Sequence, residues 1–338
     1  MKKRSALIIF ASLFFILLTA CGEKSKEDVV QNLEEKIEKM SGYKTNATMT
    51  MNTGKEEQKY HIEVWHKKKD FYRVKLQHDQ DEEGSQVILK NKDGVYVLTP
   101  ALNKSFKFQS DWPQNSSQPY LYESLVQDIM KDPESTFTVM DDYYMFKTKT
   151  NYQNNKSLPY QEIYFEKKTY QPVLVKVYDQ DMQALVEVQF SKFTKDPSFK
   201  EEDFEVQKNM AAVQSEVPVM NMEENQAFTV RYPSEQLGAE MTEKQEVDLE
   251  NGKRVIMTYE GERNFTLIQE QAEVQTVSTS DVVPVQGEPV NLGFTVGAQS
   301  ENMLEWNYKG MNFRLASESL TKEEMIAVAS SVYEQAEK

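Results

Sequence analysis

Cysteine is almost absent from this sequence of 338 residues, in which Cys21 is the only example. A single thiol excludes intramolecular disulfides as a source of stability, so the folded chain must depend on its apolar core in any redox compartment. The position of this cysteine also indicates its role, because it follows directly after the most hydrophobic run of the chain.

Histidine is scarce as well, since His61, His66 and His78 are the only three. His61 and His66 fall in one expected strand, where the alternation of side chains directs them to opposite faces. The sequence has no G-x-S-x-G, H-E-x-x-H or glycine-rich phosphate motif. We therefore expect no enzyme, no metal site and no cofactor.

Basic residues are outnumbered, with 39 Lys and Arg against 54 Asp and Glu and a formal net charge of −15. The first 20 residues carry three bases and no acid, so their removal leaves a charge of −18. Nucleic acids require a basic face, and we expect no nucleic acid partner. Anionic lipid head groups also repel such a chain, so an anchor would have to hold it at a membrane.

The N-terminus supplies a candidate anchor. Three basic residues (2–4) precede an apolar run (6–18), which is typical of a secretory signal peptide and shorter than the roughly 20 residues of a membrane-spanning helix. Leu18-Thr19-Ala20-Cys21 resembles the bacterial lipobox, whose cysteine is diacylated and becomes the first mature residue. We predict a lipoprotein signal peptide at 1–20, lipid attachment at Cys21 and a lipid-anchored position on the extracytoplasmic face of the cell membrane. The alternative is a buried cysteine in an uncleaved signal anchor.

The next segment has a helical period and is followed by strands. Ser25 and Asp28 form a capping-box pattern before a helix that Ser41-Gly42 ends. Short strands of period two come next, with a second helix expected at 120–130. The first six expected strands lie at 43–51, 60–66, 71–76, 85–90, 94–99 and 105–108, and further strands continue to about Phe193.

A second, smaller unit follows a change in pattern. The regular spacing of apolar residues is lost at 206–226, which we interpret as a linker. Strands resume after it and precede a last helix with the capping box Thr321/Glu324. The predicted division is a first domain at 21–205, a linker at 206–226 and a small α+β domain at 227–338. Consecutive antiparallel strands with a few helices indicate an α+β fold rather than βαβ alternation.

Aromatic residues are abundant, with 17 Phe, 17 Tyr and 3 Trp. Some strands are apolar on both faces: Val95 and Val97 lie on one face, and Tyr96 and Leu98 on the other. One face can pack on the two helices of the first domain. The other face is either covered by a further layer of the protein or open to an apolar ligand, and both interpretations remain at this point.

The stretch D-G-V-Y-V-L-T-P (93–100), with the helices at 25–40 and 120–130 on either side, resembles the lipoprotein-carrier superfamily of LolA carriers, LolB receptors and RseB-type sensors. Residues 108–129 and 148–163 resemble more specifically the YdcC-type lipoproteins of spore-forming Gram-positive bacteria, which are linked to sporulation. The resemblance implies a curved, incomplete antiparallel β-barrel with helices across its mouth and an apolar cavity. It also implies a role in sporulation.

These observations lead to two functional hypotheses. The first is a membrane-anchored protein whose cavity binds an acyl chain, a lipoprotein or lipopeptide, or another amphiphile. The second is a non-catalytic regulatory or scaffold lipoprotein that binds an envelope protein partner, as RseB-type proteins do. The candidate cavity residues, chosen by strand alternation, are Tyr60, Ile62, Val64, Tyr72, Val74, Leu76, Val87 and Leu89.

Overall fold

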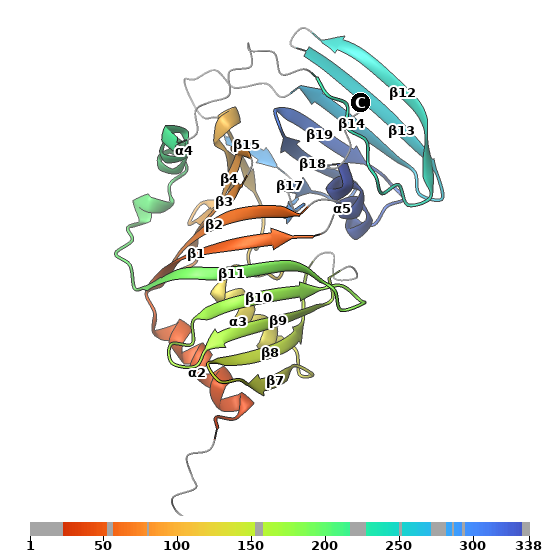
Figure 1. The fold of residues 1–338 in the computed structure, drawn as a ribbon. Helices are drawn as coiled ribbons and strands as arrows, with labels where there is room; N and C mark the ends of the chain where they lie inside the picture. The colour runs from red at the N-terminus through yellow and green to blue at the C-terminus, as the bar shows by residue number, and fades with distance from the viewer. Residues whose placement is uncertain are drawn as a thin grey trace, which may run out of the picture.

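The computed structural model describes residues 23–52, 57–79, 81–152, 158–216, 228–249, 252–271, 282–285, 287–292 and 295–332. The predicted signal peptide, Cys21 and the second half of the predicted linker lie outside these ranges. The described chain forms two curved, open antiparallel sheets with helices, which confirms the predicted α+β class. We call residues 23–216 the first unit and residues 228–332 the second unit (Figure 1).

The first unit contains a large sheet that is built as two meanders. Strands β1 to β6 form one meander and β7 to β11 the other, and β1 pairs with β11 to join them into one surface. The strands are β1 (Gly42–Met51), β2 (Gln58–Lys67), β3 (Phe71–His78), β4 (Asp81–Asn91), β5 (Gly94–Thr99), β6 (Lys104–Phe108), β7 (Thr136–Val139), β8 (Tyr143–Lys149), β9 (Tyr160–Glu166), β10 (Pro172–Tyr178) and β11 (Ala184–Lys195), with the short helix η1 (Pro100–Leu102) between β5 and β6.

Two helices pack on the concave face of this sheet. Helix α2 (Lys26–Lys39) begins with the predicted capping box, in which Ser25 Oγ accepts from the Asp28 amide at 3.1 Å and an Asp28 carboxylate oxygen accepts from the Ser25 amide. Helix α3 (Tyr122–Lys131) lies in the connection between the two meanders. Both helices contribute side chains to the largest apolar cluster of the molecule.

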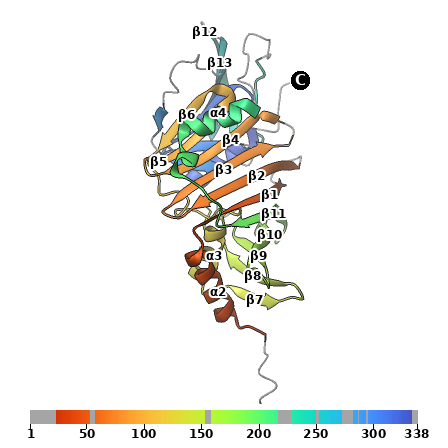
Figure 2. The same cartoon turned by 90° about the vertical axis from the view of Figure 1, so that its left-hand side faces the viewer.

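The convex face is covered by residues from the predicted linker. Residues 206–216 form helix α4 (Val206–Glu216), which follows η2 (Glu201–Phe204) and crosses the strands β3 to β5 (Figure 2). Met210 and Val213, one helical turn apart, are buried there together with Phe204. The structure therefore differs from the expectation for this half of the linker, because its apolar residues close the outer face of the sheet.

The second unit has its own sheet and core. Its order is β12-β13-β14-β19-β18-β17-β16, and α5 (Lys322–Ser331) begins with the predicted Thr321/Glu324 capping box. The strands are β12 (Ala239–Leu249), β13 (Gly252–Gly261), β14 (Phe265–Gln271), β16 (Glu288–Asn291), β17 (Val296–Gln299), β18 (Met303–Tyr308) and β19 (Met311–Ala316). Stacked Trp306 and Phe313, with ring centroids 5.1 Å apart, lie in this core.

The two units are joined by direct pairing. Strand β15 (Val282–Val285), although it belongs to the second half of the chain, pairs in parallel with β6 at the edge of the first sheet. Gln86 of β4 accepts hydrogen bonds from the Val296 amide at 2.7 Å and from Thr295 Oγ1 at 3.2 Å. Val296 itself packs in the core of the first unit. These contacts hold the second unit against the concave side of the first sheet.

Asp132, the C-cap residue of helix α3, should make the stability of the first unit depend on pH. Burial alone would raise the pKa of Asp132, but hydrogen bonds from the Lys149 amide, Thr148 Oγ1 and the Glu134 amide hold it below its ordinary value. We expect Asp132→Asn to lower the free energy of unfolding at neutral pH by about 2 kcal/mol, since bonds to a charged acceptor are lost.

A depressed pKa contributes stability that is complete above the unfolded-state value of about 3.9 and is lost as the pH falls through the folded-state value. The difference between wild type and Asp132→Asn should therefore be constant above about pH 5 and shrink below about pH 4. Urea unfolding over a pH series measures it, with Asp141→Asn at an exposed carboxylate as the control. A difference that does not change with pH would contradict the assignment.

Candidate functional site

A cleft of about 600 Å³ lies between the concave face of the first sheet and the second unit. Its floor is apolar, because Met49 and Met51 of β1, Ile88 of β4 and Val186 of β11 all point to this face and are buried. These four residues come from three strands and meet only through the curvature of the sheet.

The opposite wall belongs to the second unit. Helix α5 contributes Ile326, Ala327, Ser330 and Ser331 to this wall, and residues 289–292, in and after β16, also line it. The remaining wall is the segment between β6 and α3, which contributes a row of aromatic, proline and polar residues. These are Trp112, Ser116, Ser117, Gln118, Pro119 and Tyr120, and Tyr152, Leu158, Leu185, Asn52, Ser234, Glu235 and Val296 complete the lining.

A buried polar network supports the wall before α3. Ser117 Oγ accepts from the Asn151 amide at 2.6 Å and is also hydrogen-bonded to the carboxyl group of Asp128, which accepts from Gln161 Nε2 at 2.8 Å. Burial raises the pKa of Asp128 above its ordinary value. Burial also raises the pKa of Tyr120 and that of Tyr152, so both phenols stay neutral. This wall therefore offers hydroxyl groups and an apolar surface to the cleft.

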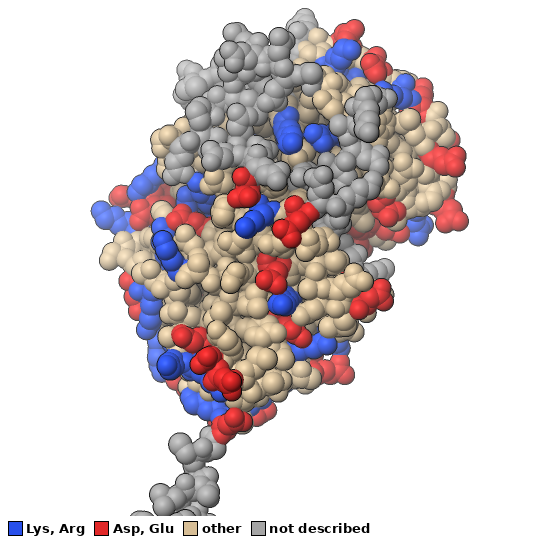
Figure 3. All heavy atoms as spheres, in the orientation of Figure 1, with Lys and Arg blue, Asp and Glu red and all other residues tan. Residues whose placement is uncertain are grey.

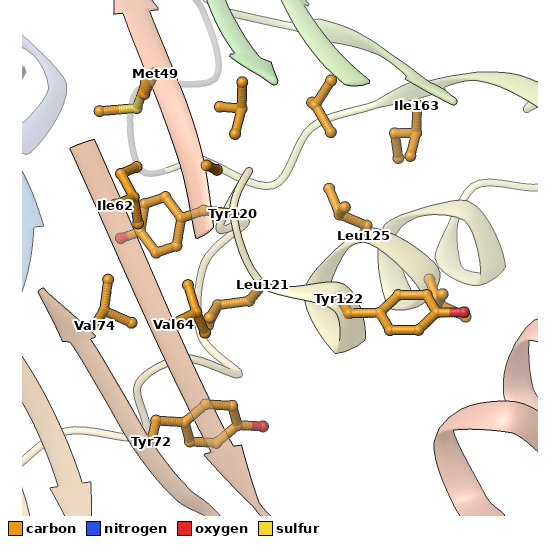
Figure 4. Close-up of a cluster of buried hydrophobic side chains, with 14 of the residues drawn as sticks. Met49, Ile62, Val64, Tyr72, Val74, Tyr120, Leu121, Tyr122, Leu125 and Ile163 are labelled. Atoms are coloured by element: carbon orange, nitrogen blue, oxygen red, sulfur yellow. The ribbon is translucent and has the colours of Figure 1, made fainter. Parts of the chain in front are cut away.

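Six of the eight predicted cavity residues lie together on the concave face. Ile62 pairs with Leu76 and Val64 with Val74 across β2 and β3, and all six are buried in the core of the first unit. In Figure 4, Tyr120 and Leu121 point toward Ile62 and Val64. This end of the face is filled by the protein's own chain. The six are Tyr60, Ile62, Val64, Tyr72, Val74 and Leu76.

The other two candidates, Val87 and Leu89, do not share that face. Val74 pairs with Ile88, so the alternation along β4 turns Ile88 inward and Val87 and Leu89 outward, where α4 covers them. None of the eight belongs to the described lining of the cleft. Ligand contact by these side chains remains a prediction.

The cleft residues that were not predicted from the sequence show why the eight candidates lie outside the lining of the cleft. Met49 and Met51 alternate with threonine at the end of β1, a pattern that marks an inward face but does not say which end of the face is open. Ile88 lies in the apolar run Val87-Ile88-Leu89. Because no polar residue interrupts this run, the sequence does not show which of its side chains point to the concave face. The residues of α5 are far away in sequence, and no local signal connects them with β1.

His61 and His66 lie on opposite faces of β2, as the alternation predicted. His61 is exposed and paired with Asp79 at 2.9 Å, whereas His66 is buried with Nδ1 2.9 Å from a carboxylate oxygen of Glu123. The other oxygen of Glu123 accepts from the Tyr43 hydroxyl at 2.9 Å, and burial together with this carboxylate raises the pKa of Tyr43. The cluster fastens the start of α3 to β1 and β2.

The residues that the structure describes hold neither a metal-binding cluster nor a membrane-spanning helix. No group of three or more His, Cys, Asp and Glu side chains is placed to hold a metal ion. No helix among the same residues is long and apolar enough to cross a membrane. On the face shown in Figure 3, acidic and basic side chains are interspersed over the first unit rather than separated by sign.

Solved structures that match this chain include the Pseudomonas aeruginosa MucA/MucB complex, with a TM-score of 0.33, 13% identity and 90% of this chain and 98% of that chain covered. They also include a LolA superfamily protein from Nitrosomonas europaea, with a TM-score of 0.32, 10% identity and coverage of 55% and 100%. The complex of the Clostridioides difficile CwlD amidase with the GerS lipoprotein matches with a TM-score of 0.20 and 15% identity over 53% and 97%.

A family profile described as "Sporulation protein YdcC-like" matches residues 2–204. The curated "Sporulation protein YdcC" of Bacillus subtilis (strain 168) is 47% identical over 338 residues, which cover 100% of this chain and 99% of the relative. The chain belongs to the YdcC-like family of sporulation proteins, and the predicted resemblance to YdcC-type proteins is confirmed.

The filled end of the concave face makes Leu121 a test of the packing. Its side chain is 0% exposed, and we expect Leu121→Ala to lower the free energy of unfolding by about 2–5 kcal/mol. Leu249→Ala, at a leucine that is 40% exposed on β12, should cost less than about 0.5 kcal/mol. Chemical denaturation followed by circular dichroism compares the two, and equal effects would show that Leu121 does not fill the face.

Proposed function

We propose that this chain is a membrane-anchored binding protein that holds an acyl chain, a lipoprotein or another amphiphile in the cleft, within the cell envelope during sporulation. The observation that carries the proposal is the cleft itself. Its volume of about 600 Å³ falls within the usual range for ligand sites, and its floor of Met49, Met51, Ile88 and Val186 offers an apolar surface with no hydrogen-bonding group.

The composition of the cleft favours an amphiphile over a wholly polar ligand. Burial of each methylene group of an acyl chain contributes about 0.8 kcal/mol, and the methionine side chains of the floor can adapt to chains of different shape. Hydroxyl and amide groups line the walls around this floor, including Ser116, Gln118 and Ser330. A ligand with a long apolar part and a polar end satisfies both kinds of surface.

The lipid anchor would set the orientation of the protein. The described chain starts at Glu23, and Ser25 caps α2, which lies at the end of the first sheet remote from the second unit (Figure 1). A lipid at Cys21 would therefore direct α2 and β7 toward the membrane and the cleft away from it. A tethered protein can receive or present an amphiphile at its own membrane, but it cannot ferry one freely between membranes.

Ligand retention is tested with a soluble chain that begins at Gly22, so that its own anchor is not mistaken for a ligand. We expect native mass spectrometry and solvent extraction to detect a stoichiometric amphiphile, and added amphiphile to raise the melting temperature by mass action. Ala327→Trp places a bulky ring in the cleft from α5 and should abolish both effects.

The matched control is Ala211→Trp, which introduces the same ring on the exposed side of α4. It should leave retention and the thermal shift unchanged. A stable wild-type protein that carries no amphiphile and gains no thermal stability from one would contradict the proposal. That result would favour the hypothesis of a protein partner in the envelope.

The anchor has a separate test. We expect Cys21→Ala, expressed in a spore-forming host from the full sequence, to lose incorporation of a radiolabelled fatty acid and to leave the membrane fraction. Two acyl chains give stable attachment, and the acidic surface supplies no other attraction to anionic lipid. Ser25→Ala, which changes a nearby residue without removing the thiol, should keep its label. Unchanged membrane association of Cys21→Ala would argue for an uncleaved signal anchor.

A further inference from the structure

We infer that the cleft prefers an amphiphile whose polar end carries an amine over one whose polar end is anionic. The inference rests on the proposed function and specifies the class of its ligand. It follows from the charges around the opening of the cleft, which come from one side chain and one helix end.

Glu235 is the only charged side chain among the described residues that line the cleft. Its backbone amide donates to Ser331 Oγ at 3.0 Å, and one oxygen of its carboxylate accepts from the Leu237 amide at 3.0 Å. The backbone of Glu235 is thus fixed beside the end of α5, and its exposed side chain lines the cleft. No lysine or arginine belongs to this described lining, so among the described residues Glu235 supplies the charge that a head group meets.

The end of α5 contributes charge of the same sign. Ser330 and Ser331 line the cleft, and they form the C-terminal end of this helix, where the macrodipole places a partial negative charge. A basic residue often balances this charge, but the last turn of α5 contains none. The helix end and Glu235 therefore act together on a head group at this position.

Two further carboxylates lie behind the walls. Glu288 accepts from Asn115 Nδ2 at 2.6 Å and from the Ser110 hydroxyl, and Asp128 accepts from Gln161. The donors to Glu288 are neutral amide and hydroxyl groups, which orient its carboxylate without cancelling its charge, whereas Asp128 also interacts electrostatically with Lys131. Since charges act over longer distances where water is displaced, Glu288 adds to the preference for a cationic end.

The test compares three probes with the same chain: hexadecylamine, hexadecanol and hexadecanoic acid. Each displaces the neutral fluorescent probe N-phenyl-1-naphthylamine from the chain that begins at Gly22, at neutral pH and below the concentration at which it aggregates. We expect the amine to displace the probe at a roughly five- to tenfold lower concentration than the acid, with the alcohol between them, as one partly exposed charge interaction predicts.

Variants separate the cleft from the overall acidity of the protein. Glu235→Gln should reduce the ratio between amine and acid, whereas Glu240→Gln, at an exposed acid on β12 outside the cleft, should leave the ratio unchanged. Equal displacement by amine and acid, or a ratio that Glu240→Gln changes as much as Glu235→Gln, would overturn the inference. Failure of all three probes would instead contradict the proposed function and the inference with it.

Discussion

The strands β3 to β5 carry apolar side chains on both faces, and the rest of the structure depends on how these faces are covered. Val95 and Val97 belong to the core of the concave side, while Tyr96 and Leu98 belong to a separate cluster on the convex side. Each such side chain contributes about 1.5–3 kcal/mol when it is buried. A sheet of this kind is stable only when a layer of protein or ligand lies on each side.

The two sides are covered to different degrees. On the convex side, α4 and Phe204 close the surface, and Asn209 of α4 is fixed because it accepts from Arg73 Nε at 2.6 Å. On the concave side, α2, α3 and the segment around Leu121 fill one end. The other end faces α5 across the cleft, and this is the part of the concave face that helices of the first unit do not fill.

The cleft also links the two units. Gln86 and Val296 connect them beside the cleft, and β15 extends the first sheet with a strand from the second half of the chain. A ligand between Ile88 and Ile326 would touch both units and would stabilise their mutual arrangement by mass action. Under the proposed function, such coupling would let an occupied cleft change the surface that the two units present together.

Much of the local structure was predictable because it depends on neighbouring residues. The capping boxes at Ser25 and Thr321 set the starts of α2 and α5 within four residues of sequence, and turns between alternating strands set the meanders. Helix α4 was missed because two apolar residues, Met210 and Val213, are too few to indicate a helix that packs on a sheet. Val87 and Leu89 were assigned to the concave face because, in a wholly apolar run, the sequence does not show which side chains point to which face.

The sequence by itself therefore determined the class of fold and the apolar character of both sheet faces, since these follow from periodicity, caps and composition. It also identified the family, through the resemblance of residues 108–129 and 148–163 to YdcC-type proteins. Only the tertiary structure decided which face α4 closes, which end of the concave face Leu121 fills and where the open cleft remains. The physical reason is that the cleft is formed by residues such as Met49 and Ile326, whose proximity results from sheet curvature and from the docking of the second unit. Neither of these is encoded in a local pattern.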